Sequence, residues 1–457
     1  MSDSSRRLCR QSNECESNME CFNGECRCRP DSSETSDGRC IIRVRSVPPD
    51  SQCGQMRDAP YIPSRGQTHN HVAKGHPNRP LVIRVKAETL QRCPRDGSCR
   101  LPKCFCSQSG MEIPNQLSAS EVPQMVLLTF NDPITDQSIK IFKSVFDGRF
   151  RNPNGCPVKA TFFVSHEWNN YDQTQWLRSR GHEIAVNSFS AENLTVASPS
   201  RWHQELNGMK EALRQFSYIR KDDIIGFRAP YLSLGGENQF AAMVRNGFRF
   251  ESTMRTNGQP YWPQTLGYSV AWNCSGMGCP RKPYPSIWEI PIGSIEVVAG
   301  DQKPRSIVDI IQSKDTSESV ATRLFNNFLR YYNYNRAPFV LEMDKRFLEA
   351  LPEGGAVIAV EKFLEKVLNV SDVYVVSASQ LIAWMETPAR LTKIHNFNAW
   401  KCSNPYENYF RPCENPSTCA FTCERGESHA FRVCGSCPRA YPVLGDPLGS
   451  GHHTRIH

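Results

Sequence analysis

Residues 124–132 read Gln-Met-Val-Leu-Leu-Thr-Phe-Asn-Asp, and this stretch decides the fold. Its apolar run, 125–130, has the length and composition of a buried strand. The run ends on two polar residues, Asn131 and Asp132, and the next residue, Pro133, cannot donate a hydrogen bond to a neighbouring strand. A buried strand that ends on adjacent polar side chains predicts a functional edge of a sheet.

Further short apolar segments follow, separated by amphipathic stretches. We expect strands at 160–164, 183–186, 224–227, 338–343 and 373–376. Apolar residues have helical spacing from Ile139 to Val145, behind a capping Thr135 or Asp136, and again over 206–216. Alternating strands and helices predict parallel pairing, and about 280 residues suffice to close such a sheet into a (β/α) barrel.

In barrels of this kind, the loops that follow the carboxyl ends of the strands carry the functional site. The residues that the sequence places there are Asn131 and Asp132, the segments 187–191 and 228–231, Glu251 and Asp344. We therefore expect these side chains to converge.

The composition predicts a secreted chain. Its 457 residues include 20 cysteines, clustered at both ends, which is typical of a disulfide framework in an oxidising compartment. Three glycosylation sequons agree with that prediction: Asn193-Leu-Thr, Asn273-Cys-Ser and Asn369-Val-Ser. Residues 1–7 contain no apolar run and do not form a secretory signal.

The charge and hydropathy of the chain argue against two classes of partner. The 54 Lys and Arg residues against 46 Asp and Glu residues give a net charge of +8, spread along the chain. Such a spread indicates a solvated surface and not a nucleic-acid interface. No segment approaches the roughly 20 apolar residues of a membrane span.

Cysteine spacing divides the chain into four parts. Residues 1–45, with six cysteines and few large apolar residues, resemble EB or EGF-like modules held by disulfides, with a zinc site as the alternative. Residues 46–92 lack periodicity and are predicted to be a flexible linker. The barrel is expected over 93–400, beginning with a knot of four cysteines, and a Cys-rich extension with structural bridges over 401–457.

Five stretches, in order, resemble the motifs of the polysaccharide deacetylases, the fourth carbohydrate esterase family. They are Leu-Thr-Phe-Asn-Asp at 128–132, Gly-His-Glu-Ile-Ala-Val-Asn-Ser-Phe-Ser-Ala at 181–191, Arg-Ala-Pro-Tyr at 228–231, Phe-Glu-Ser-Thr-Met at 250–254 and Arg-Ala-Pro-Phe-Val-Leu at 336–341. Among these enzymes, the stretches look most like those of the chitin deacetylases of animals. The resemblance implies a distorted (β/α) barrel that binds a divalent metal such as zinc and removes N-acetyl groups from polymers of N-acetylglucosamine.

Amide hydrolysis explains the residues that the family needs. A metal polarises the carbonyl, a carboxylate deprotonates the attacking water, and an acid protonates the leaving amine. The metal and a backbone N–H stabilise the oxyanion. The resemblance implies that an Asp-Asp pair supplies the base and one ligand, that a His-Ser-x-x-His pattern supplies two further ligands, and that a late histidine is the acid.

This chain differs from the family at most of those positions. Asn131 stands at the position of the base, and an amide oxygen is not basic near neutral pH. Asp132 is the metal ligand that remains, because the two histidine positions are Asn187 and Ala191. Asp344 stands at the position of the late histidine. These replacements predict a poor zinc site, and no cofactor is expected.

A substitute ligand set is the alternative. Glu192, Glu342 or Asp344 could donate oxygen atoms, which suit a hard ion better than zinc. His182 is expected to be too far away, because it lies about 13 Å from the end of its strand.

Other positions of the implied groove keep their residues. The resemblance implies that Arg228 orients the base and that the N–H of Tyr231, after Pro230, faces the oxyanion. Glu251 stands where the family has Asp and could pair with Arg228. Trp262 resembles an aromatic wall of the substrate groove. The alternatives are a structural ion pair for Arg228 and Glu251 and a core position for Trp262.

Two functions from different classes remain. We favour a secreted, non-catalytic member of the family that binds chitin or a related polymer of N-acetylglucosamine. Its N-terminal Cys-rich module could contact matrix proteins. The alternative is an active metal-dependent amidohydrolase that removes N-acetyl groups from chitin-like polymers, using zinc or another divalent metal.

Overall fold

The computed structural model describes residues 19–22, 25–28, 32–34, 40–42, 90–274, 278–297, 305–402, 413–422 and 428–451. Most of the predicted linker and much of the module over 1–45 lie outside these ranges. Within that module, strand β1 (Met19–Phe22) pairs antiparallel with β2 (Glu25–Cys28), and β3 (Ser32–Glu34) pairs antiparallel with β4 (Cys40–Ile42). The four domain boundaries stay predictions.

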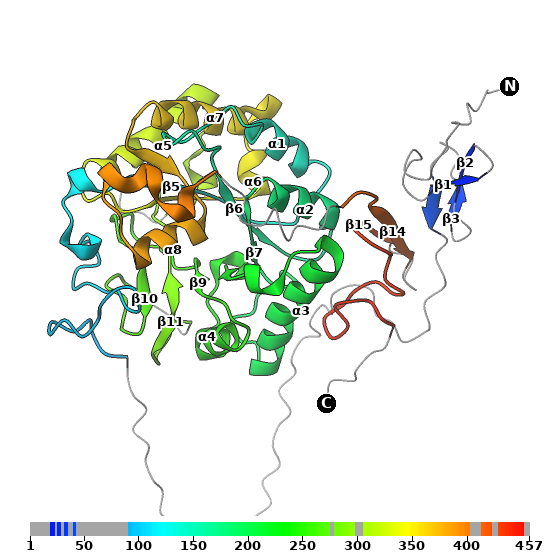
Figure 1. Ribbon diagram of the computed structural model, residues 1–457, viewed down its shortest axis with the longest axis horizontal. Coiled ribbons are helices and arrows are strands. Elements are labelled where there is room, and N and C mark those ends of the chain that lie inside the picture. The colour runs from blue at the N-terminus through cyan, green and yellow to red at the C-terminus, as the bar shows by residue number, and fades with distance from the viewer. Residues whose placement is uncertain are drawn as a thin grey trace, which may run out of the picture.

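A nine-stranded sheet forms the core, and Figure 1 shows it curled, with helices around its outside. The strand order is β10-β11-β9-β8-β7-β6-β5-β12, with β13 also paired to β5. The strands are β5 (Gln124–Phe130), β6 (Ala160–Val164), β7 (Glu183–Val186), β8 (Gly226–Phe227), β9 (Phe250–Glu251), β10 (Gln264–Leu266), β11 (Tyr284–Glu289), β12 (Phe339–Met343) and β13 (Val373–Val375). Among these described strands, only β10 pairs antiparallel. This is the expected distorted (β/α) barrel.

Eight α-helices lie in the described part of the chain. They are α1 (Ser138–Val145), α2 (Tyr171–Ser179), α3 (Pro199–Ser217), α4 (Gly236–Arg245), α5 (Ser317–Tyr332), α6 (Lys345–Leu348), α7 (Gly355–Leu368) and α8 (Ala378–Glu386). The residue that precedes α1 is Gln137, whose side chain makes no capping hydrogen bond, so neither predicted cap stands at that position. Thr135 accepts a hydrogen bond from the N–H of Ser138 at 3.2 Å, and Asp136 pairs with Arg432.

Strand β5 is buried along its whole length. The carboxyl-terminal half of β5 packs in an aromatic cluster, in which Phe130 stacks on Phe162 with ring centroids 5.1 Å apart and also contacts Phe142 of α1. A strand covered on both faces reads as a continuous apolar run. That is why the sequence located β5 correctly.

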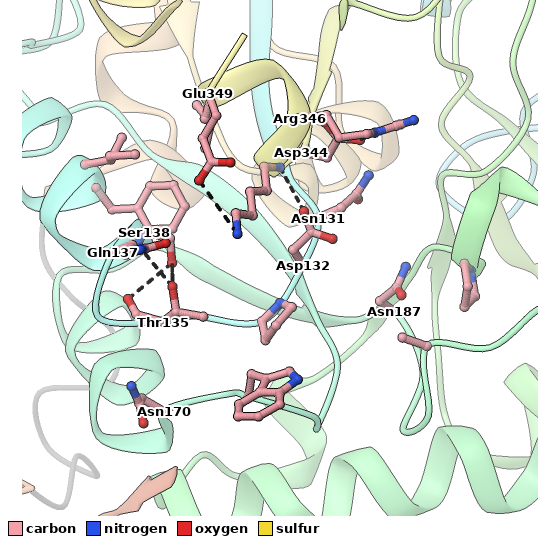
Figure 2. Close-up of a pocket in the computed structure, with 18 of the residues that line it drawn as sticks. Asn131, Asp132, Thr135, Gln137, Ser138, Asn170, Asn187, Asp344, Arg346 and Glu349 are labelled. Atoms are coloured by element: carbon pink, nitrogen blue, oxygen red, sulfur yellow. Dashed lines mark hydrogen bonds and ion pairs between the residues drawn. The ribbon is translucent and has the colours of Figure 1, made fainter. Parts of the chain in front are cut away.

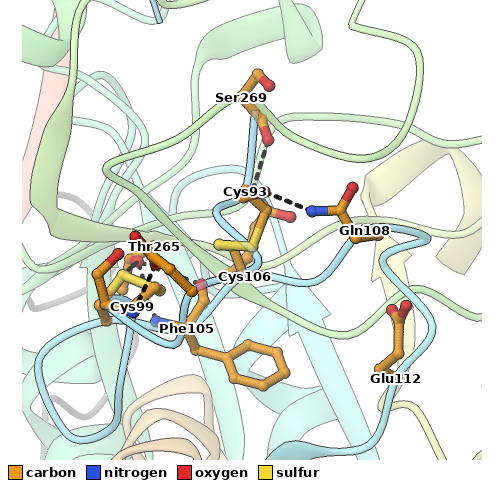
Figure 3. Close-up of a disulfide and its surroundings, with 12 residues drawn as sticks. Cys93, Cys99, Phe105, Cys106, Gln108, Glu112, Thr265 and Ser269 are labelled. Carbon is orange, nitrogen blue, oxygen red and sulfur yellow. Dashed lines mark hydrogen bonds between the residues drawn. A yellow bond between two sulfur atoms is a disulfide. The ribbon is translucent and has the colours of Figure 1, made fainter. Parts of the chain in front are cut away.

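Two disulfides join the predicted knot of four cysteines, Cys93 to Cys106 and Cys99 to Cys104 (Figure 3). The knot packs on the edge of the sheet at β10. Thr265 donates its N–H to the carbonyl of Phe105 at 2.9 Å, and the N–H of Phe105 donates to the Thr265 hydroxyl at 3.2 Å. The N-terminal knot therefore extends the barrel.

The Cys-rich extension forms an antiparallel hairpin of β14 (Ser417–Thr422) and β15 (Ser428–Val433). Its disulfides are Cys413 to Cys434 and Cys419 to Cys437, and Cys402 is joined to Cys156 in the barrel. The expected structural bridges are confirmed, with pairings that spacing left open. In the described part of the chain, none of the helices has the length and apolar character needed to cross a membrane.

Candidate functional site

A cleft of about 1350 Å³ opens at the carboxyl ends of the central strands. Figure 2 shows Asn131 and Asp132 at the end of β5, with Asp344 beside them and Asn187 across the cleft. The predicted site residues that line it are Asn131, Asp132, Asn187, Ala191, Pro230, Tyr231 and Asp344, and Glu342 lines it too. The predicted convergence of these loops is therefore present in the structure.

The amide of Asn131 is fixed by two charged partners. Its Nδ2 donates to Oε1 of Glu342 at 2.5 Å, and its Oδ1 accepts a hydrogen bond from Nη1 of Arg228 at 3.2 Å. A carboxylate cannot donate, so Asp at this position would place two carboxylates against each other. The contact with Glu342 gives a physical reason for the amide at the position of the base.

Glu342 belongs to β12, next to β5 in the sheet. The residue is 9% exposed, and its Oε2 accepts from Nη2 of Arg255 at 3.0 Å. The polar floor of the cleft is thus a chain of alternating partners, Arg228, Asn131, Glu342 and Arg255. Both oxygens of the Glu342 carboxylate are hydrogen-bonded within this chain.

Arg228 is fully buried, and every nitrogen of its guanidinium has a partner. Nε and Nη2 donate to the carbonyl and hydroxyl of Ser252 at 2.6 and 2.9 Å, and Nη1 also donates to the hydroxyl of Thr129 at 2.9 Å. The guanidinium lies over the ring of Phe163 at 4.1 Å. Burial lowers the pKa of Arg228 to about 10, while the nearby Glu342 charge opposes that shift, so the side chain stays charged near neutral pH.

The expected ion pair between Arg228 and Glu251 does not form. The Glu251 carboxylate instead accepts from the N–H of Thr253 at 3.0 Å and lies opposite Glu289 in the register of β9 and β11. Burial raises the pKa of both carboxyls, and the neighbouring Glu251 charge adds to the rise at Glu289, which is the stronger of the two. Glu251 is fully buried in this pair and does not line the cleft.

Asp132 and Asp344 both contact the start of α6. Asp132, in the left-handed region with φ 78°, accepts from the N–H of Lys345 at 2.8 Å. Burial raises the pKa of Asp132, and the Lys345 N–H opposes that shift. Asp344 caps the helix through the N–H of Phe347 at 3.0 Å and pairs with Arg346 at 2.6 Å. The Asp344 carboxylate is therefore engaged on both oxygens.

The residues at the implied metal position do not fit a transition-metal site. Asn187 donates its Nδ2 to the carbonyl of Arg228 at 3.0 Å, and Ala191 has no donor atom in its side chain. Asp132 is the one residue with a carboxyl group among the three implied ligands. Across the described ranges, no three His, Cys, Asp or Glu side chains come together as a metal site would require.

The substitute ligands proposed from the sequence are engaged elsewhere. Glu192 pairs with Arg201 at 2.8 Å, and the Glu342 and Asp344 carboxylates have the arginine partners described above. His182 is buried at the start of β7, where its Nδ1 accepts from the N–H of Ala160 at 3.2 Å. As expected, this imidazole is remote from the cleft.

The aromatic wall predicted at Trp262 is not in the cleft. Trp262 is 1% exposed and stacks on Trp384 with centroids 5.6 Å apart, so the core alternative describes it correctly. The aromatic side chains exposed at the cleft are Tyr231, which is 76% exposed, and Trp168, which is 52% exposed. Sequence reasoning missed Trp168, although it follows the predicted strand 160–164 as an aromatic in a polar turn.

The C-terminal hairpin also lines the cleft, which the sequence did not predict. The residues it contributes are Thr418, Ala430, Phe431 and Arg432. Arg432 donates to Asp172 of α2 at 3.0 Å and to Asp136 at 2.7 Å. The extension is thus a wall of the cleft as well as a clamp on the barrel.

Comparison with known proteins agrees with this geometry. A polysaccharide deacetylase family model matches residues 120–250, which span β5 to the start of β9. Chitin deacetylase 1 of Bombyx mori is 35% identical over 385 residues, covering 79% of this chain and 69% of that protein. The chain belongs to the polysaccharide deacetylase family.

Two further similarities were found. Chitin deacetylase 8 of Bombyx mori is 31% identical over 364 residues, covering 77% of this chain and 92% of that protein. Among solved structures, a putative polysaccharide deacetylase from Mycobacterium smegmatis covers 58% of this chain and 93% of its own, at 18% identity and a TM-score of 0.40. The assignment of Asn131, Asn187 and Ala191 to the family positions of Asp and two histidines stays a prediction from the motifs.

Proposed function

We propose that this chain is a non-catalytic polysaccharide deacetylase of the extracellular space, which binds chitin-like polymers of N-acetylglucosamine in its cleft. The observation that carries the proposal is the Asn131 amide, which donates to Glu342 at 2.5 Å. Because the amide hydrogens point at a carboxylate, this residue cannot accept a proton from water. The position that would hold the base is occupied by a hydrogen-bond donor.

The ligand positions support the same proposal. Asn187 and Ala191 supply no imidazole, and Asp132 alone is a weak basis for binding a transition metal. Changes outside the ligand shell typically lower metal affinity about 10–100-fold, so losing two direct ligands has a larger effect. Without a base and without these ligands, the cleft keeps the means to bind a glycan and not to hydrolyse it.

The remaining cleft suits an acetylated sugar. Tyr231 and Trp168 present exposed rings, and among the described residues none accepts a hydrogen bond from the N–H of Tyr231. That N–H is therefore available to an acetamido carbonyl. The six disulfides of the described ranges form in an oxidising compartment, which supports a place outside the cell. The similarity to the chitin deacetylases of Bombyx mori supports chitin as the polymer.

Two assays test the proposal. Acetate release from N-acetylglucosamine oligomers is measured with zinc, cobalt or manganese added, and retention on chitin beads is measured in parallel. We expect retention without acetate release. Substantial acetate release that disappears in Asp132→Ala would overturn the non-catalytic assignment, and failure to bind chitin would overturn the glycan assignment.

A second function, an amidohydrolase with a relocated base, is favoured by one observation. The Glu342 carboxylate lies beside the position of the base and lines the cleft. In that case the wild-type chain would release acetate and the Glu342→Gln variant would not. We rank this function second because both oxygens of the Glu342 carboxylate already accept hydrogen bonds, one from Asn131 at 2.5 Å and one from Arg255 at 3.0 Å.

A further inference from the structure

Trp168 presents its indole to solvent although it is the kind of side chain that folding normally buries. It follows β6, is 52% exposed and lines the cleft. Its φ of 64° lies in the left-handed region, which non-glycine residues rarely adopt, and the N–H of Asn169 closes the turn on the carbonyl of His166 at 3.0 Å. Strained backbone of this kind often marks a functional position.

The indole is supported from behind by the C-terminal extension. His429 of β15 stacks on Trp168, with centroids 5.4 Å apart and an interplanar angle of 29°. His429 is 7% exposed, and neither ring nitrogen has a hydrogen-bond partner among the described residues. Tyr441 packs on the imidazole at 4.7 Å. The imidazole therefore acts as a flat packing surface that holds the indole in place.

Polar groups of the same region are held rigidly. Arg432, three residues after His429 on β15, donates its backbone N–H to Oδ1 of Asn170 at 3.0 Å and its guanidinium to Asp136 at 2.7 Å. Asn170, Asp136 and Arg432 all line the cleft. Hydrogen-bonding groups and an exposed ring thus occur together, which is the usual composition of a small-ligand site.

We propose that Trp168 is a sugar-binding subsite, on which one pyranose ring of an N-acetylglucosamine polymer stacks, with the C-terminal hairpin as its support. The inference rests on the proposed glycan-binding function. A pyranose with equatorial substituents has a flat face of C–H groups, and the negative face of an indole attracts such hydrogens. The hydroxyls at the edge of the sugar ring then meet Asn170, Asp136 and Arg432. The extension is therefore part of the binding site.

The test is the affinity of the full chain for the hexamer of N-acetylglucosamine, measured by isothermal titration calorimetry. Trp168→Ala is expected to weaken binding about tenfold, as loss of a central aromatic contact does. Trp168→Phe keeps a ring and is expected to retain most of the affinity. Tyr334→Ala is the matched control, because Tyr334 is 59% exposed and does not line the cleft. It should bind like wild type.

His429 is assigned a positioning role, and its variants test the support. His429→Ala should weaken binding, whereas His429→Phe should restore it, because a second flat ring replaces an imidazole whose nitrogens have no partner among the described residues. If His429→Ala fails to fold, the comparison of Trp168→Ala with Trp168→Phe still shows whether an aromatic ring at this position contributes to binding. Equal affinity of Trp168→Ala and wild type would overturn the subsite while leaving glycan binding intact. A wild-type chain that binds no hexamer would overturn the proposed function itself.

Discussion

In the wild-type chain the Asn131 amide donates to Oε1 of Glu342 at 2.5 Å, so Asn131→Asp would bring a second carboxylate to that distance. A hydrogen bond to a charged group, worth about 1.5–3 kcal/mol, would be lost. Two carboxylates in contact cannot both ionise freely, so one would take up a proton. Arg228 and Arg255 offset part of this repulsion. We expect a net loss of about 2–4 kcal/mol of unfolding free energy at pH 7.

The sign of the pH dependence follows from that proton. The pKa of the carboxyl pair would be higher in the folded variant than in its unfolded chain, so the folded state would bind more protons. The destabilisation of Asn131→Asp should therefore shrink as the pH falls from 7 to 5. Urea unfolding at the two pH values, compared with wild type, measures this difference.

A double substitution separates this contact from other effects. When Asn131→Asp is combined with Glu342→Gln, the introduced glutamine amide can donate to the introduced carboxylate, which restores a donor and an acceptor. We expect the pair to recover about 2 kcal/mol relative to the sum of the single changes. Equal stability of Asn131→Asp and wild type at pH 7 would refute the reasoning about Glu342. Acetate release by Asn131→Asp with zinc added would refute the reasoning about the missing ligands.

Three further predictions concern the whole chain. Burial lowers the pKa of His166 and His182 from 6.5 to about 3, so the unfolded chain binds more protons, and the unfolding free energy falls below about pH 6.5, by about 2 kcal/mol for each histidine at pH 5. In His182→Gln the urea midpoint should therefore decrease less between pH 7 and pH 5 than in wild type. The same decrease in both proteins would contradict this prediction. Replacing both Cys156 and Cys402 with Ala should lower the unfolding free energy by about 2–5 kcal/mol, because their disulfide joins residues 246 apart in the sequence and so restricts the unfolded chain. An unchanged denaturant midpoint would contradict this prediction. If the chain passes through a secretory pathway as proposed, enzymatic removal of N-glycans should reduce its mass by three glycans, because the three sequon asparagines are exposed: Asn193, Asn273 and Asn369. An unchanged mass would contradict this prediction.

The strands of the barrel were largely predictable because most are apolar runs. β6 (Ala160–Val164) and β7 (Glu183–Val186) have the predicted bounds, and both are buried throughout. The sequence missed β9, β10 and β11. β9 has only two residues, and β11 (Tyr284–Glu289) begins with a partly exposed segment that contains Pro, so neither shows the pattern of a buried strand. Their pairing depends on contacts that local sequence does not encode.

The composition of the site was predictable, but its contacts were not. The positions of Asn131 and Asp132 follow from the end of β5, whereas the bond from Asn131 to Glu342 joins residues 211 apart and depends on the register of β5 and β12. The groove position predicted for Trp262 is wrong because its burial against Trp384 is a tertiary contact, which local sequence does not show. Trp168 escapes prediction for a similar reason, since its support comes from a hairpin far along the chain.

The metal content of the purified protein tests the central claim most directly. The wild-type chain and Asp132→Ala are produced and purified without added metal salts, and the metal content of both is measured by inductively coupled plasma mass spectrometry. The residues around Asp132 predict no stoichiometric transition metal in either protein, and no difference between them. One zinc, cobalt or manganese ion per wild-type chain, absent from Asp132→Ala, would contradict the account and identify the chain as an enzyme.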